Sequence, residues 1–213
     1  MAFMRHLLIL LTTILYCDSY SQCGNRYNQA IFTDYDTETY NFGENTTYDG
    51  RLQSLDLDLY SPKTDTVTNR PCVILCFGGA FVQGTKTSPE LVFMAGHFAQ
   101  RGFVCASIDY RLDDQSNLTA KGDSAESGAA IRAVQDAKAA IRYLKSKHSD
   151  FGIDTNMIFI GGTSAGGITA LTLGYSQYSE FPNSVKAIID NLGGYEGTTN
   201  NLPNTSTVKG LFN

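Results

Sequence analysis

Residues 162–166 read Gly162-Thr163-Ser164-Ala165-Gly166. This G-x-S-x-G stretch follows an apolar run at 157–160 and precedes a segment rich in alanine and leucine, so it lies between a predicted strand and a predicted helix. A turn this tight strains the backbone of Ser164 and leaves little room for side chains at the glycines beside it. The pattern predicts a serine nucleophile whose hydroxyl projects from the edge of a sheet, at the positive end of the following helix.

The N-terminal part of the chain predicts an antiparallel hairpin. Leu55, Leu57 and Leu59 alternate with aspartates, as in a strand that has one face in water. The run at 39–42 and the Asp49-Gly50 turn supply the other strand and the connection.

Three further apolar runs predict strands. The runs at 71–77 and 103–108 are continuous, which is typical of strands buried on both faces. The run at 185–189, after the Ser164 turn, predicts one more strand of the same sheet.

Helices are predicted between these strands. Ser88 and Pro89 mark the start of a helix that Gly102 ends, and apolar residues at helical spacing predict another over 128–148. The polar residues 112–127 are expected to form a loop. Alternating strands and helices with no linker predict one α/β domain over 22–213, with a doubly wound, mostly parallel sheet.

A second motif, Phe77-Gly78-Gly79-Ala80-Phe81, follows the strand predicted over 71–77. Acyl transfer to a serine needs two backbone N–H groups that stabilise the oxyanion of the tetrahedral intermediate. One comes from the residue after the nucleophile, here Ala165, and the other from a loop of small residues after a neighbouring strand. Gly79 and Ala80 occupy that second place, so these three residues are the predicted oxyanion hole.

Four segments, in this order, resemble the α/β-hydrolases of the carboxylesterase and lipase group, near the hormone-sensitive-lipase-like and secreted bacterial esterases. They are 77–81, 107–112 (Ser-Ile-Asp-Tyr-Arg-Leu), 136–144 and 161–167. The resemblance implies an α/β-hydrolase fold and hydrolysis of small or polymeric carboxylic esters through an acyl-enzyme on Ser164, without a cofactor. The family commonly has histidine where this chain has Phe77, which implies a differently supported oxyanion loop.

The general base and its acid are not identifiable. His97 and His148 both precede Ser164 and belong to predicted crossover helices, whereas the family order is serine, acid, histidine. The acids that follow Ser164 are Glu180, Asp190 and Glu196. Asp190, at the end of the strand predicted over 185–189, is the weak candidate for the acid. We expect a C-terminally truncated hydrolase that lacks its last strands and is inactive, although a scaffold that has lost its base stays open.

Two other functions remain alternatives. One is a serine peptidase of the same fold, and the other is a non-catalytic binding module on a hydrolase scaffold, which the missing histidine favours. In Asp109-Tyr110-Arg111, the Asp and Arg are interpreted as structural residues that pair with backbone and neighbouring loops at the strand end, rather than as a clamp for a substrate carboxylate.

Composition excludes several classes. Lys and Arg number 16 against 21 Asp and Glu, a net charge of −5, and no basic cluster is present, which argues against nucleic acid as a partner. Cys72 and Cys76, four residues apart in one strand, are too far apart to form a disulfide. The sequence has no C-x-x-C pair, the motif that would indicate a structural zinc or redox site. The pairing of Cys23 and the oligomeric state stay open.

Residues 1–21 are typical of a cleaved signal peptide. Arg5 and His6 precede a largely apolar run at 7–16, and the small residues Ser19 and Ser21 suit signal peptidase. A run of about ten residues is too short to cross a hydrocarbon core that needs about 20. The sequence therefore predicts export, to the periplasm or the medium, with no membrane span.

The export prediction has a direct test. Expressed in a Gram-negative host, the exported protein is expected to begin near Gln22 or Cys23, because Ser21 is the last small residue in a cleavage context. N-terminal sequencing of periplasmic or secreted protein checks this, and a chain that still begins at Met1 would contradict it.

Overall fold

The computed structural model describes residues 24–213, so the predicted signal peptide and Cys23 lie outside the described residues. Six strands form one sheet in the order β1-β2-β4-β3-β5-β6. Their bounds are β1 Tyr35–Thr46, β2 Leu52–Pro62, β3 Arg70–Cys76, β4 Val104–Ile108, β5 Ile153–Gly162 and β6 Gly210–Phe212.

Strand register places the two predicted loops side by side. β1 and β2 form the expected antiparallel hairpin, and β2 pairs antiparallel with β4. β3, between β4 and β5, runs parallel to both, and Cys76 at its end lies opposite Gly162 at the end of β5. The segments that follow these two residues therefore leave the sheet at the same edge.

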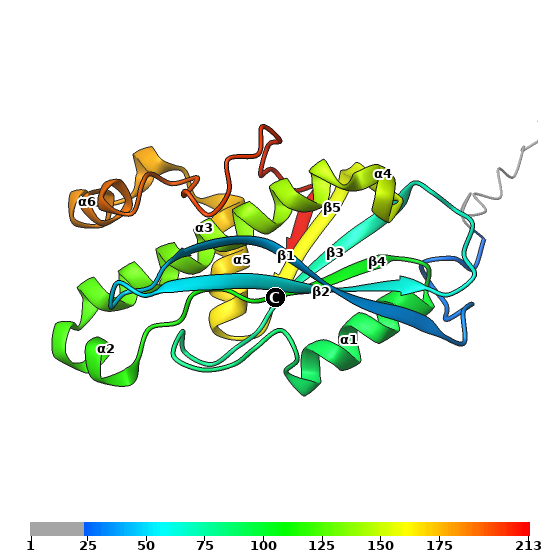
Figure 1. The fold of residues 1–213 in the computed structure, drawn as a ribbon, viewed down its shortest axis with the longest axis horizontal. Coiled ribbons are helices and arrows are strands. Elements are labelled where there is room, and N and C mark those ends of the chain that lie inside the picture. Colours follow the sequence, from blue (N-terminus) through cyan, green and yellow to red (C-terminus); the bar gives the residue numbers. More distant parts are fainter. Residues whose placement is uncertain (1–23) are drawn as a thin grey trace, which may run out of the picture.

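Helices cover both faces of the sheet, as a doubly wound fold requires. Figure 1 shows α1 below the sheet and α3 above it, and α1 packs on β2, β3 and β4 whereas α3 packs on α5 and β5. Their bounds are α1 Pro89–Gln100, α2 Gln115–Lys121, α3 Asp123–Ser146, α4 His148–Phe151, α5 Ala165–Tyr175, η1 Tyr178–Glu180 and α6 Asn183–Asn191. Within the described residues, no helix is both long and apolar enough to cross a bilayer.

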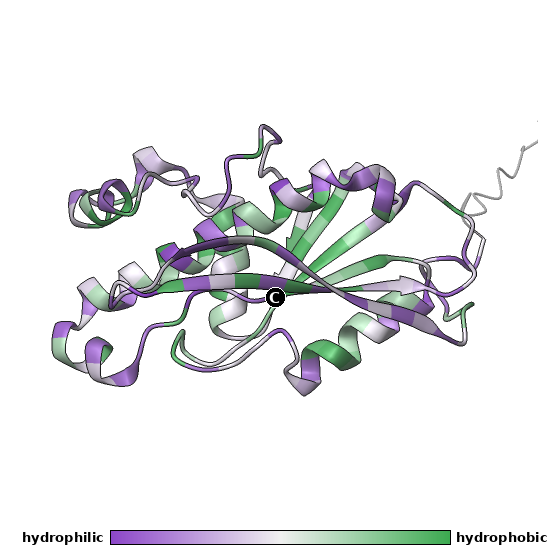
Figure 2. Cartoon of the chain, viewed as in Figure 1, coloured by the Kyte–Doolittle hydropathy of each residue, from purple (hydrophilic) through white to green (hydrophobic). Residues whose placement is uncertain are grey.

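The central strands form the core. Figure 2 shows hydrophobic residues along β3, β4 and β5 and hydrophilic residues along the outer side of α3. Cys72, Cys76 and Cys105 are buried without disulfides, and burial raises the pKa of Cys72 and Cys76 to about 12. These cysteines are small apolar core residues, as the sequence predicts.

Two local predictions are wrong. Residues 185–189 lie in helix α6 rather than in a strand, and of this run only Ile189 is buried. Val185, Ile188 and Ile189 have helical spacing, and a short apolar run does not distinguish helix from strand. The strand beside β5 is instead β6, which pairs Phe159 with Gly210, so this edge of β5 is covered rather than bare.

Most of the polar segment 112–127 is also helical rather than a loop, since α2 begins at Gln115 and α3 at Asp123. Asp114 caps α2 by accepting a hydrogen bond from the Asn117 N–H at 2.9 Å, and Gly122, with φ of 54°, separates α2 from α3. Polarity hid these helices because they lie on the surface, where few apolar residues mark a buried face.

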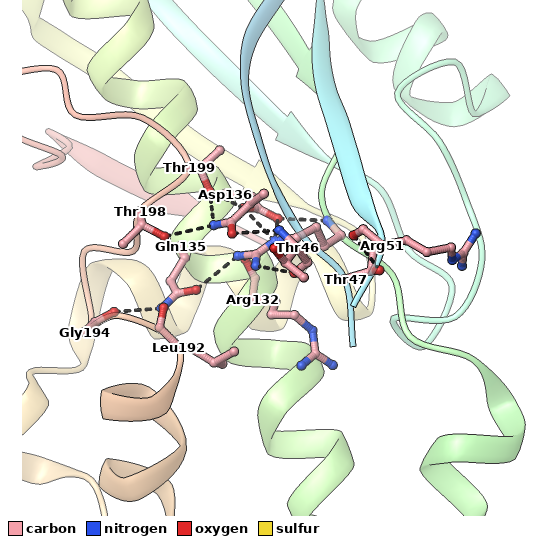
Figure 3. A network of polar contacts seen from close by, with 12 residues as sticks. Thr46, Thr47, Arg51, Arg132, Gln135, Asp136, Leu192, Gly194, Thr198 and Thr199 are labelled. Atoms are coloured by element: carbon pink, nitrogen blue, oxygen red, sulfur yellow. Dashed lines mark hydrogen bonds and ion pairs between the residues drawn. The ribbon is translucent and has the colours of Figure 1, made fainter. Parts of the chain in front are cut away.

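A buried ion pair joins several elements. Arg111, which is 2% exposed, donates from Nε to Asp136 Oδ2 at 2.8 Å, and Asp136 of α3 is fully buried. Arg111 also donates to the Thr46 carbonyl of β1, and Thr199 Oγ1 donates to Asp136 (Figure 3). The predicted structural role of Asp109-Tyr110-Arg111 is confirmed for Arg111, which has no room for a substrate.

Asp136→Asn is expected to destabilise the fold by about 3 kcal/mol, because it leaves the buried Arg111 guanidinium without a counter-charge. Urea denaturation measures the loss. The matched control is Asp34→Asn, since Asp34 pairs with Lys63 at the surface and its side chain is 64% exposed. The control is expected to change stability by less than about 0.5 kcal/mol, and equal effects would contradict the role of the buried pair.

Candidate active site

The Ser164 turn has the geometry that the sequence predicts. Ser164 has φ of 52° and ψ of −115°, a strained conformation for a residue with a side chain, and it is exposed at the first turn of α5. A Cβ at Gly166 would lie 2.1 Å from the Cys76 carbonyl oxygen, and one at Gly162 would lie 2.4 Å from the same atom. Only glycine permits this approach of β3, β5 and α5, and the approach sets the conformation of Ser164.

The loop after β3 lies against this turn. A Cβ at Gly78 would lie 3.3 Å from the Ser164 Cβ. Gly79, Ala80 and Phe81 have φ of 129°, 53° and 62°, three successive residues in the left-handed region. The Gly79 carbonyl accepts from two later N–H groups, Val82 at 3.0 Å and Gln83 at 3.1 Å, which closes the loop into a tight turn.

The predicted oxyanion donors have no acceptor within the described part of the chain. No hydrogen bond from the backbone N–H of Gly79, Ala80 or Ala165 is formed there. Unpaired N–H groups at the start of a helix and in a strained loop attract negative charge. The fold brings all three residues to the sheet edge that holds Ser164, and this leaves their N–H groups available to a developing oxyanion.

Tyr110 supports the oxyanion loop. Its ring stacks on Phe77, with centroids 4.0 Å apart and an interplanar angle of 13°, and its hydroxyl donates to the Phe77 carbonyl at 2.8 Å. Tyr110 is 1% exposed, and burial raises its pKa. The altered support expected from phenylalanine at position 77 is therefore an aromatic stack, which no spacing in the sequence indicated.

Asp109 supports the next part of the same loop. Its Oδ1 accepts from the Lys86 N–H at 2.9 Å, and Lys86 Nζ lies 3.3 Å from Asp58 on β2. Burial raises the pKa of Asp109. Asp109 and Tyr110 thus hold both ends of the loop that carries Gly79 and Ala80.

No hydrogen bond joins Ser164 to either histidine of the described residues. His148 precedes β5 and Ser164 follows it, and at about 3.3 Å per residue the strand puts them roughly 30 Å apart. His97 lies in the last turn of α1, where its ring packs edge-on against Phe93 with centroids 4.3 Å apart. Among residues 24–213, Ser164 therefore has no hydrogen-bonded base.

The three acids after Ser164 have other partners. Asp190 lies in α6 and accepts from the Tyr178 hydroxyl at 2.9 Å, so the strand-end position expected of it is wrong. Glu196 pairs with Lys138 and Arg142, and Glu180 accepts from the Gln177 N–H.

A cavity of about 380 Å³ opens beside Ala80. Its lining residues are Ala80, Phe81, Gln115, Leu118, Thr119 and Glu126. The segment 112–127, which sequence reasoning treated as a solvated loop, thus supplies most of the surface next to the oxyanion loop. Among residues 24–213, no group of three His, Cys, Asp or Glu side chains is arranged to hold a metal.

The strand order, the strained serine and the adjacent loop of small residues define an α/β-hydrolase. The family profile described as BD-FAE matches residues 57–201. The chain therefore belongs to the BD-FAE family, which confirms the resemblance to α/β-hydrolase esterases.

Curated relatives include Esterase LipC of Mycobacterium tuberculosis, 30% identical over 156 residues, with 69% of this chain and 36% of the relative covered. Gut esterase 1 of Caenorhabditis elegans is 30% identical over 152 residues, with 71% and 26% covered. Among solved structures, an esterase of Thermogutta terrifontis has a TM-score of 0.58 at 23% identity, and the match covers 83% of this chain and 52% of that one. The chain thus spans about a third or less of the two curated relatives and half of this structural neighbour.

The strain at Ser164 predicts a stability difference. The free energy of unfolding of Ser164→Gly is expected to be about 1 kcal/mol higher than that of Ser164→Ala, because glycine relieves the positive φ and alanine does not. The Ser164 side chain makes no capping hydrogen bond, so neither change removes one.

Ser176 is the matched control, since its φ of −94° suits any residue. There Ser176→Gly is expected to be less stable than Ser176→Ala. Chemical denaturation of the four variants checks both orders, and a less stable Ser164→Gly than Ser164→Ala would contradict the strain.

Proposed function

We propose that this protein is a serine carboxylic-ester hydrolase that acts through an acyl-enzyme on Ser164. The observation that carries the proposal is the strained, exposed Ser164 beside the unpaired N–H groups of Gly79, Ala80 and Ala165. The esterases among its relatives support the same reaction class.

In the proposed reaction, Ser164 Oγ bonds to the ester carbonyl carbon as its proton passes to a general base. The oxyanion that forms accepts hydrogen bonds from the Ala165 N–H and from the loop of Gly79 and Ala80. The bond to the alcohol oxygen then breaks, and the base gives its proton to the leaving alcohol. Water repeats these steps on the acyl-enzyme, which releases the carboxylic acid and restores Ser164.

We propose further that the base is a histidine outside the described residues. Neither His97 nor His148 is hydrogen-bonded to Ser164, and a serine hydroxyl without a base reacts slowly. Lacking its base, the 213-residue chain keeps only the oxyanion-hole and binding contributions, about 10³–10⁴ over water. Under this proposal, the 213-residue chain is inactive as an esterase.

The substrate class in this proposal is a small-molecule or polymeric ester, and the protein is exported through the N-terminal signal. The cavity beside Ala80 is large enough for one side of such an ester, with Phe81 and Leu118 as its apolar lining. The position of Glu126 in the same lining favours neutral or hydroxylated groups over anionic ones.

A non-catalytic binding module is the second candidate, favoured by the position of both histidines. The strain stored at Ser164 argues against it, because a binding scaffold gains nothing from a strained serine.

The nucleophile has a direct test. In a chain extended beyond Asn213 along its reading frame, Ser164→Ala is expected to lower p-nitrophenyl butyrate hydrolysis at least 10³-fold and to abolish fluorophosphonate labelling. The matched control is Ser176→Ala, which lies at the far end of α5 and is expected to keep activity and label.

The 213-residue chain, measured beside the extended one, tests the source of the base. Slow hydrolysis by the short chain and full activity of the long one support a histidine beyond Asn213. Full activity of the short chain would mean that His97 or His148 acts as the base. Unchanged turnover in Ser164→Ala would show that Ser164 is not the nucleophile.

A further inference from the structure

A second cavity lies at the start of β5, whereas Ser164 follows the end of the same strand. It has a volume of about 550 Å³, in the range of small-molecule sites. Its lining residues are Lys145, His148, Thr155, Asn156, Asn204, Thr205, Thr207, Val208 and Lys209. None of them is acidic and only Val208 is apolar, an unusual lining in a chain with a net charge of −5.

Lys145, at the C-terminal end of α3, differs from the other buried cations. Five further Lys and Arg side chains are buried in the described part of the chain, and each has a carboxylate within 4.0 Å: Arg70, Arg111, Arg132, Lys138 and Arg142. Lys145, which is 6% exposed, has no carboxylate within that distance among residues 24–213.

The partners of Lys145 are all neutral. Its Nζ donates to the Thr207 carbonyl at 2.7 Å, to Thr205 Oγ1 at 3.1 Å and to Thr207 Oγ1 at 3.3 Å. Burial lowers the pKa of Lys145, and no neighbouring carboxylate opposes this shift. A buried ammonium held only by neutral oxygens gains stability from an anion brought close to it.

The other lining groups suit an anion that also carries hydroxyls. Lys209 adds a second ammonium, and His148 adds a ring with an N–H donor. The threonine hydroxyls and asparagine amides both donate and accept hydrogen bonds, as sugar hydroxyls do. The segment that leads into β6 is fixed at this side of the cavity, because the Lys209 N–H donates to the Ile158 carbonyl of β5 at 2.7 Å.

We propose that this cavity binds a polyhydroxylated anion, a sugar carboxylate or a sugar phosphate. Lys145 and Lys209 neutralise the charged group, and His148 and the Thr and Asn side chains hydrogen-bond the ligand. Thr155 and Asn156 lie at the start of β5 and Ser164 follows its end, which puts the two sites roughly 30 Å apart. Binding here is independent of the proposed ester hydrolysis.

Isothermal titration calorimetry of the purified protein with glucuronate, glucose 6-phosphate and glucose tests the proposal. At least one charged sugar is expected to bind one to one, at least tenfold more tightly than glucose. Preference for glucuronate or for the phosphate ester identifies the charged group as carboxylate or phosphate. Binding of Ser164→Ala is expected to be unchanged, which separates this site from the candidate active site.

Lys209→Gln is the informative variant, since Lys209 is exposed and its side chain makes no hydrogen bond within the described residues. It is expected to weaken binding about tenfold, the loss of one charge-assisted hydrogen bond. Lys145 is left intact because it holds Thr205 and Thr207 in place.

The matched control is Lys63→Gln, which removes one surface charge outside the cavity and is expected to leave binding unchanged. Three results would overturn the proposal: equal binding of glucose and the charged sugars, an equal effect of Lys63→Gln and Lys209→Gln, or loss of binding in Ser164→Ala.

Discussion

The contact between the Cys76 carbonyl and the glycines of the Ser164 turn is the constraint on which the rest of the structure depends. It brings the ends of β3 and β5 so close that any Cβ at Gly162 or Gly166 would collide with this oxygen. The same contact holds Ser164 in its strained conformation and sets the oxyanion loop beside it. The local strain is stable because the buried ends of β3 and β5 hold the turn in place.

The loop itself depends on residues from another strand. Tyr110 and Asp109, which follow β4, hold its beginning and its end through one hydrogen bond each to the backbone at Phe77 and Lys86. The next residue, Arg111, ties this support to α3 through the buried pair with Asp136 and to β1 through its hydrogen bond to the Thr46 carbonyl. A short sequence motif therefore links the candidate site to the most deeply buried ion pair of the fold.

The segment 196–207 contacts α3 through hydrogen bonds and ion pairs of the Lys and Arg side chains of that helix. Glu196 accepts from Lys138 and Arg142, whereas Lys145 binds only neutral oxygens of the segment that leads into β6. Lys138 and Arg142 are thus neutralised by a carboxylate of the protein, whereas Lys145 is not, and its cavity suits an anion. Two candidate sites of different chemistry thus lie at the two ends of strand β5.

The sequence by itself determined the hairpin, the buried strands, α1, α3 and the place of Ser164, because each rests on local periodicity or on glycines that a tight turn requires. It also indicated Gly79, Ala80 and Ala165 as neighbours of the serine. Only the tertiary structure decided that 185–189 is helical and that β6 covers β5. It likewise decided the stack of Tyr110 on Phe77 and the missing counter-charge of Lys145. These features depend on contacts between residues far apart in the chain, which local spacing does not encode.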